Sequence, residues 1–173
     1  VVDGPERRLE ANLNGSVPIA IQHQARGTAD AVRAAADHID PRRPVIVLAG
    51  DVPLIRASTL RSLVEQHERE GAAATMATVV LEDPSGYGRV VRAPDGTVER
   101  VVETKAPGDA TPHELHIREV NTGIFAFGGG ALLNALEHVR GDNAQGELYL
   151  PVVMAILRSH GRTVLAHELS DPG

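Results

Sequence analysis

The carboxylate of Asp51 occupies a position in the sequence that is suited to binding a metal ion. Asp51 is the first charged residue after the apolar run 45–49, in the segment Gly50-Asp51-Val52-Pro53-Leu54. The run predicts a strand, and open α/β sheets bind ligands beyond the carboxyl ends of their strands. Mg²⁺ typically takes one or two carboxylates and completes its shell with phosphate oxygens and water. Asp51 is therefore a candidate Mg²⁺ ligand, and the capping of a turn is the structural alternative.

The segment that precedes this predicted strand contains residues suited to bind a planar, polar ligand. Gln22 closes a short apolar segment, and Gly27-Thr28-Ala29-Asp30 opens a predicted helix. The Gln22 amide donates and accepts hydrogen bonds together, as the reading of a base edge requires. Thr28 can cap the helix, whose free backbone amides can meet a ligand, and Asp30 suits the helix dipole. Taken alone, these residues are also ordinary for a helix start.

A third group of polar residues borders a predicted hairpin. Gly88 belongs to a pair of glycines before it, Glu103 follows its second strand, and Asn121 interrupts a later strand. Paired glycines permit close approach of a ligand to the backbone, although most of them mark turns. An ion pair of Glu103 with Lys105 and a β-bulge at Asn121 are the structural alternatives.

The composition limits the classes of partner. The 173 residues carry 17 Lys and Arg against 23 Asp and Glu, a net charge of −6, without a basic stripe for nucleic acid or an anionic membrane. The absence of cysteine excludes disulfides and thiolate metal sites, and no apolar run has the length of a membrane span. The eight histidines lack metal-site spacing, and His113 and His116 fall in a predicted loop. We expect one soluble, cytoplasmic domain.

Alternating strands and helices position these residues. Apolar runs predict strands over residues 18–22, 45–49, 72–81, 120–127 and 163–166. Apolar residues at helical spacing predict helices over residues 5–13, 32–39, 60–67, 130–139 and 147–158. The alternation predicts an α/β fold with right-handed crossovers.

Local patterns refine this layout. Pro94-Asp95-Gly96 lies between the segments 88–91 and 97–102, which predicts a β-hairpin. The run 45–49 is apolar throughout, which predicts a strand buried on both faces, as in a parallel sheet. Phe125 and Phe127 alternate along a strand, so their side chains are expected on one face.

Read in order, these motifs resemble those of one family, the uridyltransferase domain of the bifunctional bacterial N-acetylglucosamine-1-phosphate uridyltransferase / glucosamine-1-phosphate acetyltransferase. The similarity extends over nearly the whole chain. The segments that carry it are Gln22 with Gly27-Thr28-Ala29, then Gly50-Asp51-Val52-Pro53-Leu54, Gly86-Tyr87-Gly88-Arg89, Val102-Glu103-x-Lys105, Glu119-Val120-Asn121-Thr122-Gly123-Ile124 and Asn143-Ala144-Gln145-Gly146-Glu147-Leu148-Tyr149-Leu150. The last segment is the most specific, whereas Gly-Asp-Val-Pro also occurs in neighbouring nucleotidyltransferases.

The resemblance implies a fold and a reaction. The fold is a Rossmann-like nucleotide-diphospho-sugar transferase domain with a mixed, mainly parallel sheet. The reaction is the Mg²⁺-dependent transfer of uridylyl from UTP to N-acetylglucosamine 1-phosphate, which gives UDP-N-acetylglucosamine, a peptidoglycan precursor, and pyrophosphate. Such transfers depend chiefly on alignment and on neutralisation of charge.

The resemblance also implies a role for each matching residue. Asp51 and Asn143 are the implied catalytic residues and would hold Mg²⁺. Gln22, Gly27 and Thr28 would receive the uracil. The N-acetylglucosamine moiety would be held by the remaining three residues, Gly88, Glu103 and Asn121.

The chain also departs from the family pattern. The glycine-rich phosphate loop, Leu-Ala-Ala-Gly-x-Gly-Thr-Arg-Met, is absent, so we expect residues 1–173 to be a partial domain lacking its first strand–loop–helix unit and inactive alone. Asp30 stands where the family often has His, an insertion follows Lys105, and Val152 replaces a common Asp. No β-helix acetyltransferase domain is expected.

Two other readings remain open at this stage. One is a nucleotidyltransferase that uses a different nucleotide and sugar phosphate, which the segment 143–150 disfavours. The other is a non-catalytic remnant that binds nucleotide sugars, which the absent phosphate loop favours. We also expect an exposed sheet edge to make this chain marginally stable or self-associating. The sequence does not fix the oligomeric state.

Overall fold

The computed structural model describes residues 2–4, 8–13, 15–51, 55–141 and 146–169. Two strands, β1 (Val2–Asp3) and β2 (Ala20–Ile21), form a small parallel sheet. The larger sheet contains β3 (Pro44–Leu48), β4 (Ala74–Val80), β5 (Arg89–Arg92), β6 (Val98–Val102), β7 (Glu119–Gly128) and β8 (Val164–Glu168). The helices are α1 (Arg8–Leu13), α2 (Thr28–Ala34), α3 (Ala57–Arg69), α4 (Pro112–Leu115), α5 (Gly129–His138) and α6 (Val152–Ser159), with a 3₁₀ turn over Ala36–His38.

Strand β7 lies at the centre of the larger sheet. It pairs antiparallel with β3, β4 and β5, while β6 continues the sheet beyond β5 and β8 continues it beyond β4. The mixed α/β architecture is confirmed, but the sheet is not mainly parallel. Among the described strands, β1–β2 and β4–β8 are the parallel pairs. The difference arises because β7 runs against its neighbours, a direction that an apolar run does not reveal.

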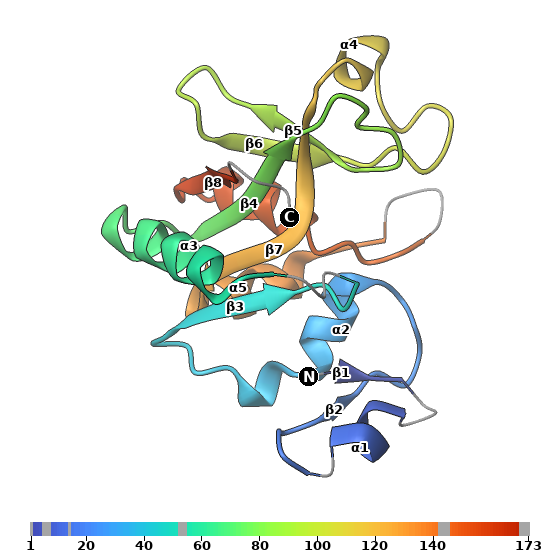
Figure 1. Cartoon of the computed structure of the whole chain (residues 1–173), viewed down its shortest axis with the longest axis vertical. Coiled ribbons are helices and arrows are strands. Elements are labelled where there is room, and N and C mark those ends of the chain that lie inside the picture. Colours follow the sequence, from blue (N-terminus) through green and yellow to red (C-terminus); the bar gives the residue numbers. More distant parts are fainter. Residues whose placement is uncertain (1, 5–7, 14, 52–54, 142–145, 170–173) are drawn as a thin grey trace.

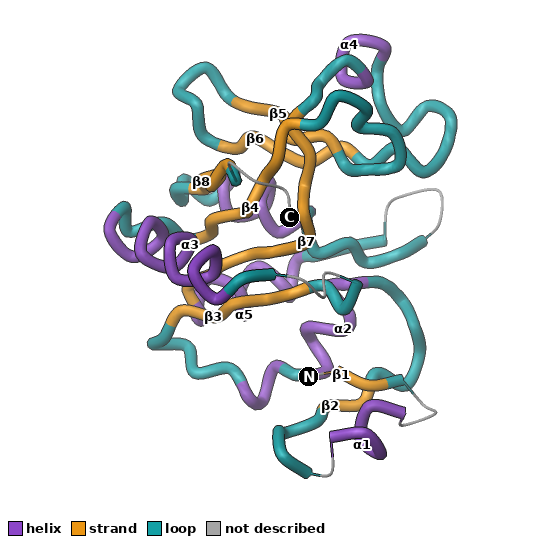
Figure 2. The backbone as a smooth tube through the Cα atoms, in the orientation of Figure 1, coloured by secondary structure: helices purple, strands orange, loops and turns teal. Residues whose placement is uncertain are grey.

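The core divides between the two faces of β7, as its alternating side chains require. Phe125 and Phe127 stack on one face, with ring centroids 5.7 Å apart, as predicted. They join one large buried cluster with apolar residues of α2, α5 and α6. On the opposite face, Ile124 and Ala126 pack with the fully buried Leu63 of α3. Figure 2 shows the β5–β6 hairpin and α4 at one end of the molecule and β1, β2 and α1 at the other.

A capping box anchors the segment between β6 and β7. The Thr111 side chain accepts a hydrogen bond from the Glu114 backbone amide, and the Glu114 carboxylate accepts one in return from the Thr111 backbone amide. Arg100 on β6 donates to the same carboxylate at 2.6 Å. These hydrogen bonds from Thr111 and Arg100 lower the pKa of Glu114 to about 2. The predicted loop around His113 is thus in fact the short helix α4.

One further predicted helix begins later than expected. The helix predicted over 147–158 begins only at Val152, and the described residues 146–151 before it are irregular or in a turn. By contrast, α3 ends as predicted at Gly71, whose positive φ of 58° suits a residue without a side chain. No helix in the described part of the chain is long and apolar enough to cross a membrane.

Strand β3 is not buried on both faces as predicted. Among the described strands it pairs with β7 alone (Figure 1). Val45 and Val47 pack against the large cluster, whereas Ile46 and Leu48 on the other face are 40% and 43% exposed. An edge strand with exposed aliphatic side chains is a template for pairing with another chain.

We expect this edge to make the 173-residue chain associate with itself. Leu48→Lys should reduce association, because a charged side chain at an edge opposes strand pairing. Sedimentation velocity over a range of concentrations measures the effect. Val80→Lys is the matched control, because Val80 is 47% exposed but lies on β4, which has a neighbour on both sides. A wild-type chain that stays monomeric throughout would contradict this expectation.

Candidate functional site

The structure brings together the three residues predicted to receive a base. Gln22 follows β2, and its side-chain amide donates to the Gly27 carbonyl at 3.2 Å. Gly27 is the N-cap of α2, so Thr28 is the first helical residue and does not cap the helix. Instead, the Thr28 hydroxyl accepts a hydrogen bond from the Leu150 backbone amide at 2.8 Å.

Gly27 is also the point at which the segment Gly146–Leu150 packs against α2. Its φ is 112°, and a Cβ built there would lie 2.6 Å from the Leu148 carbonyl oxygen. Two backbone hydrogen bonds flank this contact, from Ala29 N–H to the Leu148 carbonyl at 2.8 Å and from Leu148 N–H to the Arg26 carbonyl at 2.7 Å. Glycine is therefore required at this position both by conformation and by space.

The three residues predicted to hold a sugar also lie together. Gly88 and Glu103 flank the paired strands β5 and β6, in which Arg89 is opposite Val102. The Asn121 backbone amide donates to the Gly88 carbonyl at 3.0 Å. A Cβ built on Gly88 would lie 3.5 Å from Glu103 Oε1, so the missing side chain leaves the carboxylate accessible from this side. Gly88, Glu103 and Asn121, which belong to or border three different strands, therefore lie close to one another.

Burial raises the pKa of the Glu103 carboxyl. Lys105 opposes the shift, while the negative charges of Asp109 and Glu147 add to it. Glu103 and Lys105, both described, do not form the ion pair that was the structural alternative, and the opposing effect of the Lys105 charge on the pKa is smaller than that of desolvation. A half-buried carboxylate of this kind gains from a ligand that donates hydrogen bonds to it.

One segment joins the two groups of residues. Tyr149 is buried, and its ring carries the Lys105 ammonium 4.2 Å from its centroid. Its neighbours in the chain, Leu148 and Leu150, bond to α2 as described above. In Figure 1 this stretch, coloured orange before α6, passes between α2 and the β5–β6 hairpin. The base-side and sugar-side groups therefore lie on either side of residues 146–150.

Asp51 lies beyond β3, at the edge of this arrangement. The Ala49 backbone amide donates to the Gly123 carbonyl at 3.0 Å, which places the end of β3 beside the Asn121–Gly123 turn. There the Gly123 amide donates to Asn121 Oδ1 at 2.9 Å. Asp51 is exposed, and no described residue hydrogen-bonds to its carboxylate, so both of its oxygens are available to a cation. Asn143, its predicted partner, lies outside the described residues.

The Asp51 environment fits Mg²⁺. An exposed carboxylate at the end of a strand matches an ion that keeps most of its shell for water and phosphate oxygens. Within the described ranges, three or more His, Asp or Glu side chains nowhere gather into an all-protein metal cage. Any ion at Asp51 would therefore depend on ligand oxygens for much of its coordination.

Sequence reasoning missed the contacts of Asp30. It is 8% exposed and accepts hydrogen bonds from Gln22 at 3.0 Å and from Arg26 at 3.0 Å. The opposite charges of Arg26 and Asp30, four residues apart, are a signal that was available, although Arg26 precedes the first residue of α2. The contact with Gln22 had no comparable signal, because Gln22 and Asp30 are eight residues apart and belong to different elements.

The fold and the candidate site together define a mixed α/β domain in which the residues predicted to receive a base and those predicted to hold a sugar lie on either side of residues 146–150. Residues 6–169 match the profile of the nucleotidyl transferase family, and the chain belongs to that family. It resembles in particular the bifunctional protein GlmU of several bacteria.

Relatives at 42–48% identity agree with this assignment, and one solved structure shares the fold. The chain is 48% identical over 161 residues to GlmU of Mycolicibacterium vanbaalenii, covering 92% of this chain and 32% of the relative. It is 42% identical over 170 residues to GlmU of Shouchella clausii, covering 97% of this chain and 37% of the relative. The chain thus spans about a third of the length of these relatives. A crystal structure assigned as a Bacillus anthracis glucose-1-phosphate thymidylyltransferase superposes with a TM-score of 0.74 at 19% identity, over 98% of this chain and 66% of that one.

We expect Gly27→Ala to disrupt the contact between α2 and residues 146–150. The added Cβ would meet the Leu148 backbone, and the positive φ is costly for any residue with a side chain. Together these effects should lower the free energy of unfolding by about 2–4 kcal/mol. Urea denaturation measures the loss.

The matched control is Gly15→Ala. Gly15 has a φ of 72°, but a Cβ there would meet nothing within 4 Å. It should therefore cost only the conformational part, about 1–2 kcal/mol. Equal losses in the two variants would show that the close approach of Gly27 to Leu148 contributes nothing.

Proposed function

We propose that this domain transfers uridylyl from UTP to N-acetylglucosamine 1-phosphate, giving UDP-N-acetylglucosamine and pyrophosphate. The observation that carries the proposal is the position of residues 146–150 between the two groups. Their backbone holds Gly27 and Thr28 on one side, and Tyr149 stacks under Lys105 beside Glu103 on the other. A ligand with a base at one end and a sugar at the other matches this arrangement.

The base end lies at Gln22, Gly27 and Thr28. The Gln22 amide is held at the start of α2 by the Gly27 carbonyl, so it is preorganised to meet the edge of a planar ring. Uracil presents the donor N3–H on that edge, and the carboxamide oxygen of Gln22 can accept from it. No conformational search by Gln22 is needed when the base arrives.

The sugar end lies at Gly88, Glu103 and Asn121. Sugar hydroxyls and the N-acetyl N–H are donors, and the desolvated Glu103 carboxylate is an acceptor whose burial is offset when they bind. The absent side chain of Gly88 leaves space beside this carboxylate. The Asn121 side chain already accepts a hydrogen bond from the Gly123 amide, which fixes its orientation.

The phosphates would lie between these ends, near Asp51. An oxygen of the sugar phosphate attacks the α-phosphorus of UTP, one P–O bond forms, and the bond from that phosphorus to the leaving pyrophosphate breaks. Asp51 and Asn143 would hold Mg²⁺, which when bound supplies charge neutralisation at the phosphates. The chain's own contribution is to align the two substrates from opposite sides. The proposal places the reaction in the cytoplasm.

Glu103→Gln separates the two ends of the site experimentally. The variant should weaken binding of UDP-N-acetylglucosamine about tenfold, because a charge-assisted hydrogen bond becomes a neutral one. Binding of UDP alone should stay unchanged, because UDP lacks the sugar. Isothermal titration calorimetry measures both. Because the pKa of Glu103 is raised, affinity for the sugar ligand should also fall on acidification sooner than an ordinary glutamate would cause.

The control is Glu99→Gln, which makes the same change on β6. The Glu99 side chain is 46% exposed and pairs only loosely with Arg100, at 3.8 Å. It should leave both affinities unchanged. If Glu103→Gln weakened UDP and UDP-N-acetylglucosamine equally, the assignment of Glu103 to the sugar end would be wrong.

Asp51→Asn tests the metal ligand. Mg²⁺ should strengthen UTP binding to the wild-type chain, and this gain should be lost in the variant, because a neutral amide binds a hard cation poorly. Titrations of UTP with and without Mg²⁺ give the comparison. Asp37→Asn, at an exposed carboxylate of the 3₁₀ turn, should keep the full gain. A gain that survives Asp51→Asn would exclude Asp51 as a ligand.

A further inference from the structure

The orientation of the Gln22 carboxamide is fixed by two acceptors. Its terminal atom nearest α2 lies 3.0 Å from Asp30 Oδ2 and 3.2 Å from the Gly27 carbonyl oxygen. Only the NH₂ group fits there, because the flipped amide would set its oxygen against two other oxygens. Both donor hydrogens of Gln22 are therefore engaged within the protein.

Asp30 is equipped to act as a permanent acceptor. Burial alone would raise the pKa of its carboxyl, but the hydrogen bonds from Gln22 and Arg26 outweigh burial and hold the pKa below its usual value. Arg26 bonds to the second carboxylate oxygen at 3.0 Å, and Arg33 on the same helix adds positive charge. The carboxylate is ionised at neutral pH and cannot donate a hydrogen bond back to Gln22.

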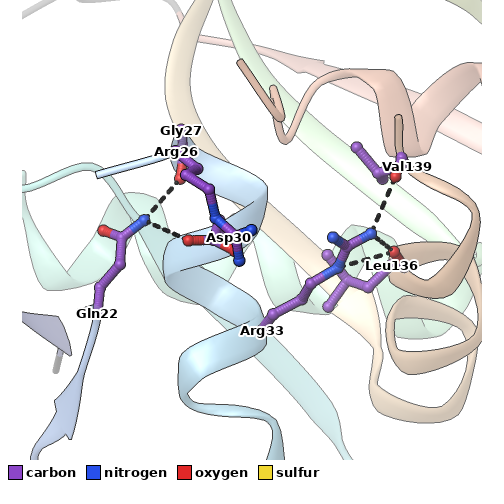
Figure 3. Close-up of polar contacts among 7 residues, drawn as sticks. All are labelled: Gln22, Arg26, Gly27, Asp30, Arg33, Leu136 and Val139. Carbon is purple, nitrogen blue, oxygen red and sulfur yellow. Dashed lines mark hydrogen bonds and ion pairs between the residues drawn. The ribbon is translucent and has the colours of Figure 1, made fainter. Parts of the chain in front are cut away.

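The oxygen of the Gln22 carboxamide is the atom left for a ligand. Figure 3 shows the Gln22 oxygen directed away from Gly27 and Asp30, with the nitrogen between them. No described residue hydrogen-bonds to this oxygen, and Gln22 is only partly buried. A ligand that reaches Gln22 thus meets an acceptor and no available donor.

We propose that Asp30 is a positioning residue for base selection, which turns Gln22 into an obligate hydrogen-bond acceptor. The inference rests on the proposed function, in which Gln22 meets the base. Uracil carries N3–H, a donor, which pairs with such an acceptor. Cytosine carries an unprotonated N3, whose lone pair would face the Gln22 oxygen. The pair Gln22–Asp30 therefore favours a uridine nucleotide over a cytidine nucleotide.

The test is the ratio of dissociation constants for CTP and UTP, measured by calorimetry on the 173-residue chain. Wild type should prefer UTP by about tenfold or more, the cost of one unmatched polar contact. In Asp30→Ala the Gly27 carbonyl is the one acceptor left to the Gln22 amide, so the amide is held less firmly and can present its NH₂ to cytosine more often, and the preference for UTP should fall. Arg26→Gln is the control, because it removes the ion pair but leaves both acceptors of Gln22, and its ratio should match that of wild type.

A reciprocal exchange distinguishes positioning from a general structural effect. In Asp30→Asn the new amide can meet Gln22 in either orientation, so the UTP preference should fall. Adding Gln22→Glu to this variant moves the carboxylate to position 22, where one oxygen accepts from the new amide at position 30, against repulsion from the Gly27 carbonyl, and the other faces the base. The double variant should regain a preference for UTP, whatever it loses in absolute affinity to both nucleotides.

A readout without ligand completes the test. The side-chain NH₂ resonances of Gln22 should show two hydrogen-bonded protons in wild type and in Arg26→Gln, and loss of one such bond in Asp30→Ala. Unchanged resonances, or a UTP preference that survives Asp30→Ala, would overturn the positioning role and leave the uridylyl proposal standing. A folded wild-type chain that does not prefer UTP to CTP would overturn the uridylyl proposal and this inference with it.

Discussion

Strand β7 hydrogen-bonds to β3, β4 and β5 along its ten residues, and the positions of the sugar-side residues follow from these pairings. Its register with β5 sets Asn121 beside Gly88, and its register with β3 sets Gly123 beside Ala49 and hence near Asp51. The alternation of its side chains builds both halves of the core at once. A shift of one residue in this strand would therefore move the site and reverse the core together.

The base side is built differently, from backbone contacts outside the main sheet. Gly27 permits residues 146–150 to approach α2, and the Leu148 and Leu150 backbones complete the contact. The two halves of the site therefore have independent supports that meet in one five-residue segment.

The sequence was sufficient for the parts of the structure that depend on local pattern. The hairpin around Pro94-Asp95-Gly96, the shared face of Phe125 and Phe127, and the stop of α3 at Gly71 all follow from turn chemistry or periodicity, and each is confirmed. The exposure of Ile46 and Leu48 was not predictable, because an apolar run does not show how many neighbours a strand has. The candidate site residues were predicted from the resemblance; the structure places the members of each group near one another, and their roles stay a prediction. The orientation of the Gln22 amide was beyond sequence reasoning, because Asp30 acts on it from another element.

Arg33 connects two helices through hydrogen bonds. From α2 it donates to the carbonyls of Leu136, in the last turn of α5, and of Val139, the C-cap of that helix (Figure 3). Helix α2 has seven residues, too few to persist by itself in water, so it is held by Arg33 at one side and by Leu148 at the other. Its amide protons will therefore exchange with solvent in step with those at the end of α5, so that the two helices open as one cooperative unit and the segment beside the base never frays alone.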